Sequence, residues 1–331
     1  MIKLKLMISI IIPNYNKSQF LAETINSIKI QTYQAWEAIV IDDFSTDSSL
    51  NIINELIVNE NRFHLIKNLS NKGTNYCRNL GIQKAKGDYI IFLDSDDILS
   101  KDCLKNRIEF FRDSSNIDFA VFCMGSFNEV IGDNTFLWNK FEGNLVKRFL
   151  SHDLPWALPS ILWNKSSLEM LNGFDESFKR YQDVELHIRA MLDDNINYAI
   201  QNSNKADCYY RISDERFGKD YFRFIQNKKN GVLHFISFFE SYLKNIGNNK
   251  SIKYLKLTFF QFLSDLFFFY RKSVLTSKEI EELLDDIFKL EIFILLFSSK
   301  DVFFLKLYIN LSKRKIYFKG LSFLIKKSLV H

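Results

Sequence analysis

The chain has 331 residues, 47% of them hydrophobic and 25% charged, so it has room for two domains of ordinary size and is not disordered throughout. No uninterrupted apolar run reaches the roughly 18–20 residues of a membrane-spanning helix, and the apolar start leads into Pro13 without a signal-peptide cleavage site. The four cysteines lack metal-binding spacing, which predicts reduced thiols in a cytoplasmic protein.

Charge and phenylalanine content change along the chain. Residues 221–331 hold 19 lysines and arginines against 9 aspartates and glutamates, whereas the whole chain has a net charge of +5. The same segment contains 18 of the 33 phenylalanines. This asymmetry predicts two domains with different partners, one over residues 1–220 and the other over residues 221–331.

The first part of the chain alternates between short β-branched apolar runs and helical patterns. Strands are predicted at residues 7–12, 37–41, 62–66, 88–93 and 117–123. Helices are predicted at residues 18–30, 46–58 and 73–86, and another begins after Ser100. This order predicts an α/β fold with a mostly parallel sheet, covered by helices on both faces, that binds ligands at the carboxyl ends of its strands.

Regular alternation weakens after residue 124, where Pro155 and Pro159 indicate extended chain or turns. A helix is predicted to begin near Tyr181. Beyond residue 220 the pattern is helical to the end. Breaks are predicted near Gly247, Thr276, Ser298 and Gly320.

Three carboxylates follow the fourth predicted strand in Asp94-Ser95-Asp96-Asp97. They repel one another, and a hard divalent cation such as Mg²⁺ or Mn²⁺ would supply the counter-charge, commonly together with diphosphate oxygens. The alternative is a solvated turn in which Asp97 or Ser100 caps the next helix.

Asp42 and Asp43 end the second predicted strand, where acids commonly bind a nucleoside's ribose or base. An Asx turn leading into Ser45 is the alternative. Arg78 lies on the predicted helix just before the strand that leads into the acidic tetrad. A guanidinium beside an acidic metal site makes sense if a diphosphate lies between them. The alternative is that Arg78 is a surface residue, as a lone arginine on a helix usually is. The sequence contains neither a P-loop nor a dinucleotide-binding fingerprint.

Together these motifs resemble the family 2 glycosyltransferases. The matching segments are P-N-Y-N (13–16), I-D-D-F-S-T-D (41–47), N-K-G-T-N-Y-C-R-N-L-G (71–81), F-L-D-S-D-D (92–97), N-G-F-D-E (172–176) and Y-Q-D-V-E-L (181–186). The resemblance covers roughly residues 7–212. It implies a GT-A-type, Rossmann-like fold that uses a nucleotide-diphospho-sugar, followed by an α-helical C-terminal region.

The resemblance also implies a role for individual residues. Contacts with the donor are implied for Pro13, Tyr15, Asp42, Asp43, Arg78, Asp94 and Ser95. Asp94 and Asp96 would form the D-x-D pair that ligates Mn²⁺ or Mg²⁺, and Asp183 would be the catalytic base. The implied reaction is the inverting transfer of one sugar from a UDP-sugar to a hydroxyl of a glycan or lipid-linked acceptor, in cell-surface polysaccharide synthesis.

The sequence departs from the family pattern at two places. Gln182 replaces the first acid of a Glu-Asp pair, and Ser213 replaces a histidine that can help bind metal or diphosphate, a role that Asp214 could take over. The Q-x-x-R-W signature of processive synthases is absent, which favours transfer of one sugar per binding event.

Two other functions remain open. A sugar-1-phosphate nucleotidyltransferase would require a glycine-rich basic loop after the first strand, and P-N-Y-N-K is not such a loop. A non-catalytic nucleotide-sugar binder or scaffold would explain Gln182 and Ser213 as signs of decay, but the intact Asp94, Asp96 and Asp183 argue against it.

The C-terminal segment combines basic and aromatic residues. Between Lys300 and Lys327 there are eight basic residues and one acid, Asp301, interleaved with phenylalanines and leucines. Such helices suit the anionic inner face of the cytoplasmic membrane, which predicts peripheral membrane binding. The alternative is a helical bundle whose aromatic stripe forms core or a homo-oligomer contact, and no motif indicates nucleic-acid binding.

Overall fold

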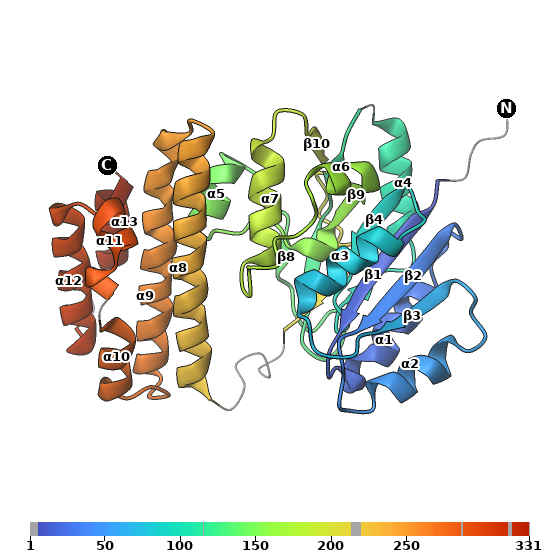
Figure 1. The fold of residues 1–331 in the computed structure, drawn as a ribbon, viewed down its shortest axis with the longest axis horizontal. Coiled ribbons are helices and arrows are strands. Elements are labelled where there is room, and N and C mark those ends of the chain that lie inside the picture. Colours follow the sequence, from blue (N-terminus) through green and yellow to red (C-terminus); the bar gives the residue numbers. More distant parts are fainter. Residues whose placement is uncertain (1–5, 115, 213–219, 286, 317–319, 331) are drawn as a thin grey trace. The chain divides into compact units, whose positions relative to one another are not determined.

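The chain forms two compact units in the computed structural model, which describes residues 6–114, 116–212, 220–285, 287–316 and 320–330 (Figure 1). The first unit comprises Met1–Gly143 and Pro155–Ser213, and we call it the α/β unit. The second comprises Asn144–Leu154 and Asp214–His331, and we call it the helical unit.

A seven-stranded sheet forms the centre of the α/β unit. Its strands are β1 (Ile8–Asn14), β2 (Trp36–Asp42), β3 (Phe63–Lys67), β4 (Tyr89–Phe92), β6 (Phe119–Val121), β9 (Ile161–Asn164) and β10 (Tyr198–Ile200), in the order β10-β6-β9-β4-β1-β2-β3. Neighbouring strands are parallel except that β9 runs antiparallel to both β4 and β6. The predicted mostly parallel sheet is therefore confirmed, but the sequence pattern did not reveal β9, which has only four residues and follows two prolines.

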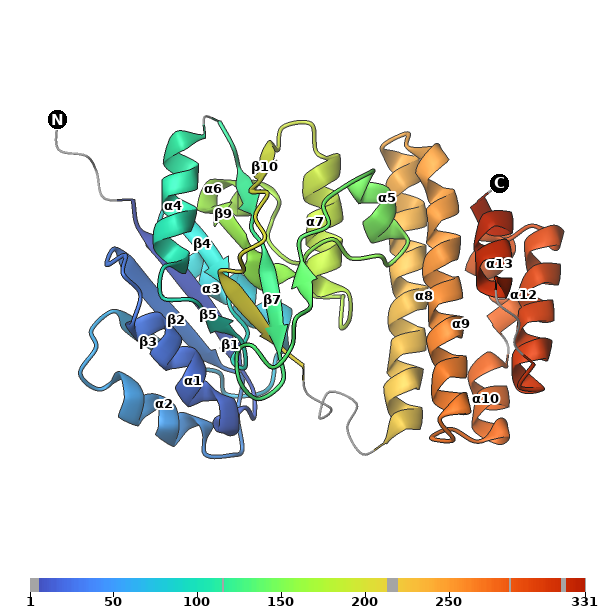
Figure 2. The ribbon, with the colours of Figure 1, turned by 180° about the vertical axis from the view of Figure 1, so that it is seen from behind.

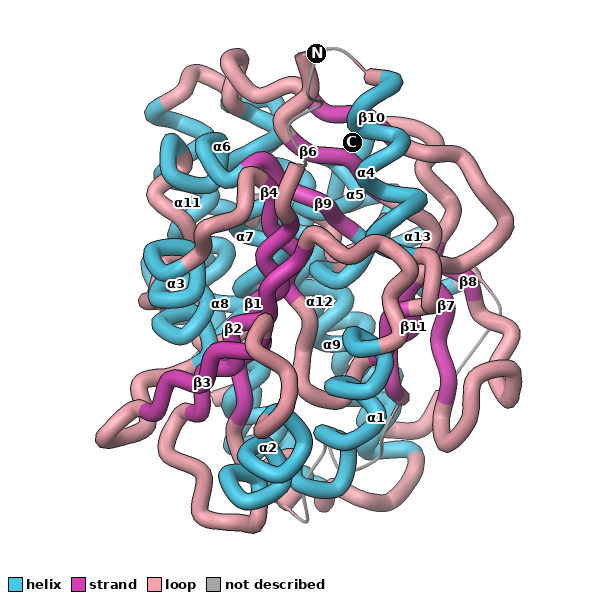
Figure 3. Tube along the Cα trace, turned by 90° about the vertical axis from the view of Figure 1, so that its right-hand side faces the viewer, coloured by secondary structure: helices cyan, strands magenta, loops and turns pink. Residues whose placement is uncertain are grey.

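Helices cover both faces of this sheet. On one face lie α1 (Ser18–Lys29), α2 (Ser49–Ile57) and α4 (Cys103–Asp113), and on the other lie α3 (Thr74–Lys84), α6 (Lys165–Met170) and α7 (Gln182–Leu192) (Figures 1 and 2). Figure 3 shows the same arrangement along the sheet, with α1 and α4 on the side opposite α3 and α6. Both faces are covered, as predicted.

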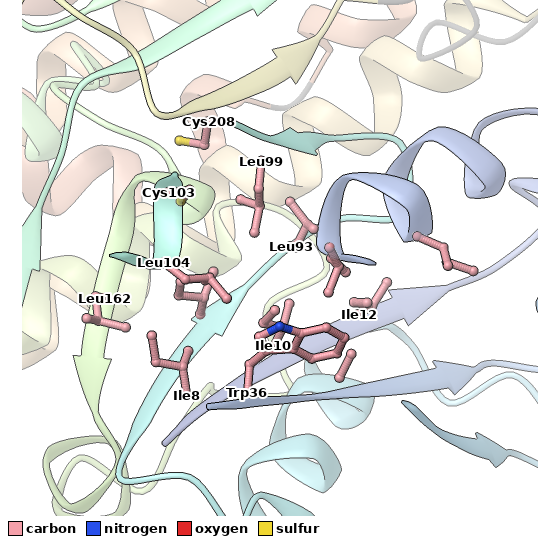
Figure 4. Close-up of a cluster of buried hydrophobic side chains, with 14 of the residues drawn as sticks. Ile8, Ile10, Ile12, Trp36, Leu93, Leu99, Cys103, Leu104, Leu162 and Cys208 are labelled. Carbon is pink, nitrogen blue, oxygen red and sulfur yellow. The ribbon is translucent and has the colours of Figure 1, made fainter. Parts of the chain in front are cut away.

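Side chains alternate between the two faces along β1. Ile8, Ile10 and Ile12 belong to the core under α1 and α4, which Figure 4 shows with residues of the neighbouring strands. Ile11 points to the other face, where α3 packs so closely that a Cβ added at Gly81 would lie 2.3 Å from its Cγ2. Burying one such isoleucine contributes about 1.5–3 kcal/mol.

A second, four-stranded sheet holds the segment that follows the acidic tetrad. Its strands are β5 (Ile98–Leu99), β11 (Cys208–Arg211), β7 (Met124–Phe127) and β8 (Leu137–Trp138), in the order β5-β11-β7-β8. Because β11 pairs antiparallel with β5, the residues around Arg211 lie beside the tetrad although they are far away in sequence.

The helical unit contains seven α-helices within the described residues. They are α5 (Leu145–Leu150), α8 (Tyr221–Asn245), α9 (Leu255–Arg271), α10 (Ser277–Leu284), α11 (Glu291–Leu296), α12 (Ser299–Lys313) and α13 (Leu321–Val330). Their ends confirm the predicted breaks. Thr276 and Ser298 form capping boxes with Glu279 and Asp301, while Gly247 follows α8.

Phenylalanine side chains make up much of the core of the helical unit, including Phe235 and Phe239 of α8 and Phe260 of α9. Helix α5 belongs to this core because Phe149 and Leu150 are buried. The Thr258 hydroxyl also donates to the Leu150 carbonyl at 2.6 Å. The structure thus groups residues 144–154, which the sequence analysis placed in the first domain, with the second. Among the described residues, no helix is both long and apolar enough to cross a bilayer.

Candidate active site

The loops after β1 and β2 are joined by buried hydrogen bonds. Asp42 is buried and accepts from Asn14 Nδ2 at 2.8 Å and from the Ser45 backbone N–H at 3.0 Å. This is the Asx turn that the sequence analysis left open as an alternative. Pro13 is buried within β1, whereas Tyr15, two residues later, is about half exposed.

Asp43 fixes the connection between β3 and α3. Its buried carboxylate accepts from Asn68 Nδ2 at 2.7 Å and from the backbone N–H groups of Lys72 and Gly73, both at 2.8 Å. Burial, reinforced by the Asp43 charge, raises the pKa of the neighbouring Cys77 thiol to about 12. That thiol therefore stays protonated at neutral pH.

The acidic tetrad, residues 94–97, forms a turn after β4 that we call the acidic loop. The carboxylates of Asp94 and Asp96 each pair with a cation. Asp94 Oδ1 lies 2.7 Å from Arg78 Nη2, and Asp96 Oδ2 lies 2.5 Å from Lys17 Nζ. Ser95, between them, is buried. The repulsion expected from the sequence is thus partly offset by two protein cations.

Asp97 is buried, whereas the carboxylates of Asp94 and Asp96 are partly exposed. Burial, together with the charges of Asp96 and Asp94, raises its pKa well above the ordinary value for aspartate. Its Oδ1 accepts from the Arg211 backbone N–H at 3.0 Å, and its Oδ2 has no hydrogen-bond partner among the described residues. Asp97 therefore ties the tetrad to β11 and does not cap the following helix α4, whose N-cap is Asp102.

Arg211 of β11 holds the backbone of the tetrad from the second sheet. Its Nε donates to the Asp96 carbonyl at 3.0 Å, and its Nη2 donates to Glu23 of α1 at 2.7 Å. The guanidinium lies between the rings of Phe20 and Phe127, at 4.6 and 4.3 Å from their centroids. Arg211 is thus a positioning residue for the acidic loop.

Arg78 links the tetrad to the first turn of α7. Besides its ion pair with Asp94, its Nη1 donates to Gln182 Oε1 at 3.3 Å. The guanidinium is buried and lies 5.3 Å from the centroid of the Phe174 ring. Of the sequence-predicted residues, the structure therefore brings Arg78, Asp94 and the Gln182-Asp183 pair together.

The loop before α7 is held by the same helix that carries Arg78. Asn79 accepts from the Phe174 N–H and donates to its carbonyl, both at 2.9 Å, and Asn75 donates to the Asp175 carbonyl at 2.7 Å. Gly173 has φ +63°, and a Cβ there would lie 2.5 Å from Asn79 Oδ1. This close fit accounts for the glycine of the N-G-F-D-E motif.

Asp183 lies in the first turn of α7, directly after Tyr181 and Gln182. Tyr181 has the left-handed backbone conformation that a bulky residue rarely adopts, with φ +60°. Burial raises the pKa of Asp183; the nearby Asp94 adds to this shift and Arg78 opposes it. A raised pKa makes the carboxylate a better proton acceptor.

The acidic loop offers two partly exposed carboxylates to a metal. The side chains of Asp94 and Asp96 are 37% and 20% exposed, whereas the described residues contain no group of three or more His, Cys, Asp or Glu arranged to hold a metal. Two carboxylates suffice where diphosphate oxygens supply further ligands, as is usual for Mg²⁺. The residues thus fit a metal bound together with the donor. Ser213 and Asp214 lie outside the described residues.

Sequence reasoning missed the two cations that contact Asp96. Lys17 could have been found as the first basic residue after the first strand. Arg211 lies in the segment that resembles the family's Tyr-Arg-x-His pattern, but no role was predicted for it, because its place beside the tetrad depends on the pairing of β11 with β5.

The chain is similar to known glycosyltransferases. The profile of Glycosyl transferase family 2 matches residues 9–159. A Haemophilus influenzae protein named an uncharacterized glycosyltransferase is 30% identical over 252 residues, which are 72% of this chain and 96% of that protein. The Escherichia coli UDP-Glc:alpha-D-GlcNAc-diphosphoundecaprenol beta-1,3-glucosyltransferase WfgD is 29% identical over 219 residues, which are 66% of this chain and 81% of that protein.

A solved structure supports the fold. The mannosyltransferase PcManGT from Pyrobaculum calidifontis, in complex with GDP-Man and Mn²⁺, matches with a TM-score of 0.55 at 14% identity, covering 99% of this chain and 86% of that chain. The protein has the predicted GT-A-type α/β fold and belongs to glycosyltransferase family 2. It is a glycosyltransferase.

Proposed function

We propose that this enzyme is an inverting, metal-dependent glycosyltransferase that moves one sugar from a UDP-sugar to a hydroxyl of a glycan or lipid-linked acceptor. The observation that carries this proposal is the position of Arg78, which contacts both Asp94 and Gln182. A diphosphate bound at the acidic loop would therefore lie close to the carboxylate of Asp183.

Charge at the acidic loop suits a nucleoside diphosphate leaving group. Arg78 and Lys17 place two cations beside Asp94 and Asp96. Negative charge develops on the diphosphate as the bond to the sugar breaks, and fixed cations stabilise that charge. A divalent metal held by Asp94 and Asp96 would supply further positive charge to the same oxygens.

Asp183 is the proposed general base. It would take the proton of the acceptor hydroxyl while that oxygen bonds to the anomeric carbon and the bond from this carbon to the diphosphate breaks. A single displacement of this kind inverts the anomeric centre. The raised pKa of Asp183 matches this role, because a more basic carboxylate accepts the proton more readily.

The nucleoside end of the donor is proposed to lie against Pro13, Tyr15, Asp42 and Asp43. The exposed ring of Tyr15 is available for stacking, whereas the two carboxylates already accept hydrogen bonds within the protein. We therefore expect Asp42 and Asp43 to act chiefly by fixing the loops. Uridine is favoured because WfgD uses UDP-Glc according to its name.

The acceptor class is also inferred from WfgD, whose name describes a diphosphoundecaprenol-linked sugar as acceptor. An enzyme that extends a lipid-linked glycan must meet its substrate at a membrane surface. We place this reaction at the inner face of the cytoplasmic membrane, in the synthesis of a cell-surface polysaccharide.

The test is a donor screen that measures release of UDP, GDP or TDP from a panel of nucleotide-sugars with Mn²⁺ or Mg²⁺. Release of UDP, abolished in Asp96→Ala, is the expected result. Release of pyrophosphate from a sugar 1-phosphate and a nucleoside triphosphate would instead support the nucleotidyltransferase. Tight UDP binding with no release from any donor would support the non-catalytic binder.

A further inference from the structure

Two helices of the helical unit expose large apolar side chains. Phe303 and Leu307 of α12 are 64% and 38% exposed, and Phe323 and Leu324 of α13 are 69% and 59% exposed. A helix at the surface of a globular protein usually turns its polar residues outward. Neighbouring exposed apolar side chains of this size are typical of an interaction surface.

These four side chains lie on the outer sides of two helices that pack together. Both helices pack against α9 and against each other, and Figure 2 shows them next to one another. Tyr308 of α12 faces inward, with its ring centroid 4.9 Å from that of Phe260, and Ile325 of α13 is buried as well. Phe303, Leu307, Phe323 and Leu324 therefore point away from α9.

Exposed lysines accompany these apolar side chains on the same two helices. They are Lys300, Lys306, Lys326 and Lys327. We call these four lysines and the four apolar residues the outer face. Asp301, the one acid between Lys300 and Lys327, is buried and lies 2.8 Å from Lys256 Nζ. Its negative charge is thus directed inward, and the outer face combines exposed lysines with exposed apolar side chains.

We propose that the outer face docks on an anionic lipid bilayer. The interface of such a bilayer offers hydrocarbon to the phenylalanines and leucines and phosphate to the lysines. A two-fold contact with a second copy would bring the lysines of both copies into one interface, where like charges repel. Nucleic acid would satisfy the lysines but would leave the apolar side chains in water.

Docking through the outer face would bring the transferase to a lipid-linked acceptor. Only this biological purpose rests on the proposed function; the docking itself does not. Vesicle binding is measured without donor or acceptor. Failure of docking and failure of the transferase activity are therefore separate results.

The experiment is co-sedimentation of the full chain with vesicles of phosphatidylcholine, with or without phosphatidylglycerol. We expect binding to the anionic vesicles at low salt, weakened by high salt, and little binding to phosphatidylcholine alone. Lys306→Glu, Lys326→Glu and Lys327→Glu together should lower the partition coefficient by at least roughly fivefold per lysine.

A second variant tests the apolar component. Replacing Phe303, Leu307, Phe323 and Leu324 by serine should lower binding to anionic vesicles more than about tenfold. Ile30→Ser with Val58→Ser, which changes exposed apolar residues of the α/β unit, is the matched control and should bind like the wild type. Circular dichroism checks that each variant is folded.

Three outcomes would overturn the proposal. The first is a wild-type protein that stays in the supernatant with anionic vesicles at low salt. The second is binding that neither set of variants weakens. The third is a wild-type protein that does not bind vesicles but forms a dimer in analytical ultracentrifugation, with the serine variant monomeric. That result would assign the outer face to a second copy.

Discussion

The two units are stabilised by different interactions. In the α/β unit, buried charged groups such as Asp43, Asp97 and Arg211 join loops at one edge of the sheet. In the helical unit, phenylalanines fill the core and most lysines lie outside. Polar burial is costly unless every group is paired, so its concentration beside the acidic loop indicates a site whose geometry must be held.

The largest effect expected from this difference is loss of activity without loss of stability. Asp183→Asn should lower kcat by the roughly 10²–10⁴-fold typical of a general base, with donor affinity nearly unchanged. Nucleotide release gives kcat, and calorimetry gives the donor Kd. A variant that loses UDP affinity but keeps its turnover would show that Asp183 belongs to the donor site.

A buried ion pair tests the stability of the α/β unit alone. Arg107 donates to Asp207 with Nε at 2.8 Å and Nη2 at 2.7 Å, and its side chain is fully buried. Arg107→Met leaves Asp207 buried without its partner and should lower the free energy of unfolding of this unit by about 3–5 kcal/mol. All four tryptophans lie in the α/β unit, so denaturation followed by tryptophan fluorescence reports its stability.

Lys105→Met, on the exposed side of the same helix, is the control for Arg107→Met. We expect it to change the unfolding free energy by less than about 0.5 kcal/mol. Equal losses in the two variants would mean that the buried pair contributes nothing specific.

The pH dependence of activity follows from the raised pKa of Asp183. The base acts only when ionised, so kcat/KM should fall about tenfold per pH unit below that pKa. Because burial raises the pKa, this acid limb should lie above the ordinary aspartate value of about 4. The residual activity of Asp183→Asn should lack the limb; its persistence would assign the titration to another group.

The smallest expected effect concerns the helical unit. The Thr276 hydroxyl accepts from the Glu279 N–H at 3.2 Å at the start of α10. Thr276→Ala should destabilise this unit by about 1 kcal/mol, with Lys278→Ala as the neutral control. Far-UV circular dichroism should record the change while tryptophan fluorescence does not. A shift in both signals would mean that the two units unfold together.

The sequence was sufficient to predict much of the α/β unit, because period-2 and helical patterns are local. It also indicated the proposed active site, since Asp94, Arg78 and Asp183 occur in recognisable segments. It could not reveal that Arg211 supports the acidic loop or that α5 packs in the helical unit. Both depend on contacts between residues about 100 or more positions apart, such as Thr258 with Leu150 and Arg211 with Asp97.

Composition was a weaker guide for the helical unit. It predicted basic, aromatic helices, but it could not separate core from surface. The structure assigns Tyr308 and Leu321 to the interior and Phe303, Phe323 and Leu324 to the exterior. That separation follows from which side of each helix meets α9.

The most direct test of the proposed catalytic site is calorimetric titration of UDP into the protein with Mn²⁺, and then in excess EDTA. We predict UDP binding with Mn²⁺ that is lost in EDTA and in Asp96→Ala, while tryptophan fluorescence shows that the variant remains folded. UDP binding that is equally tight in EDTA, together with undiminished turnover, would contradict the assignment of Asp94 and Asp96 to a metal.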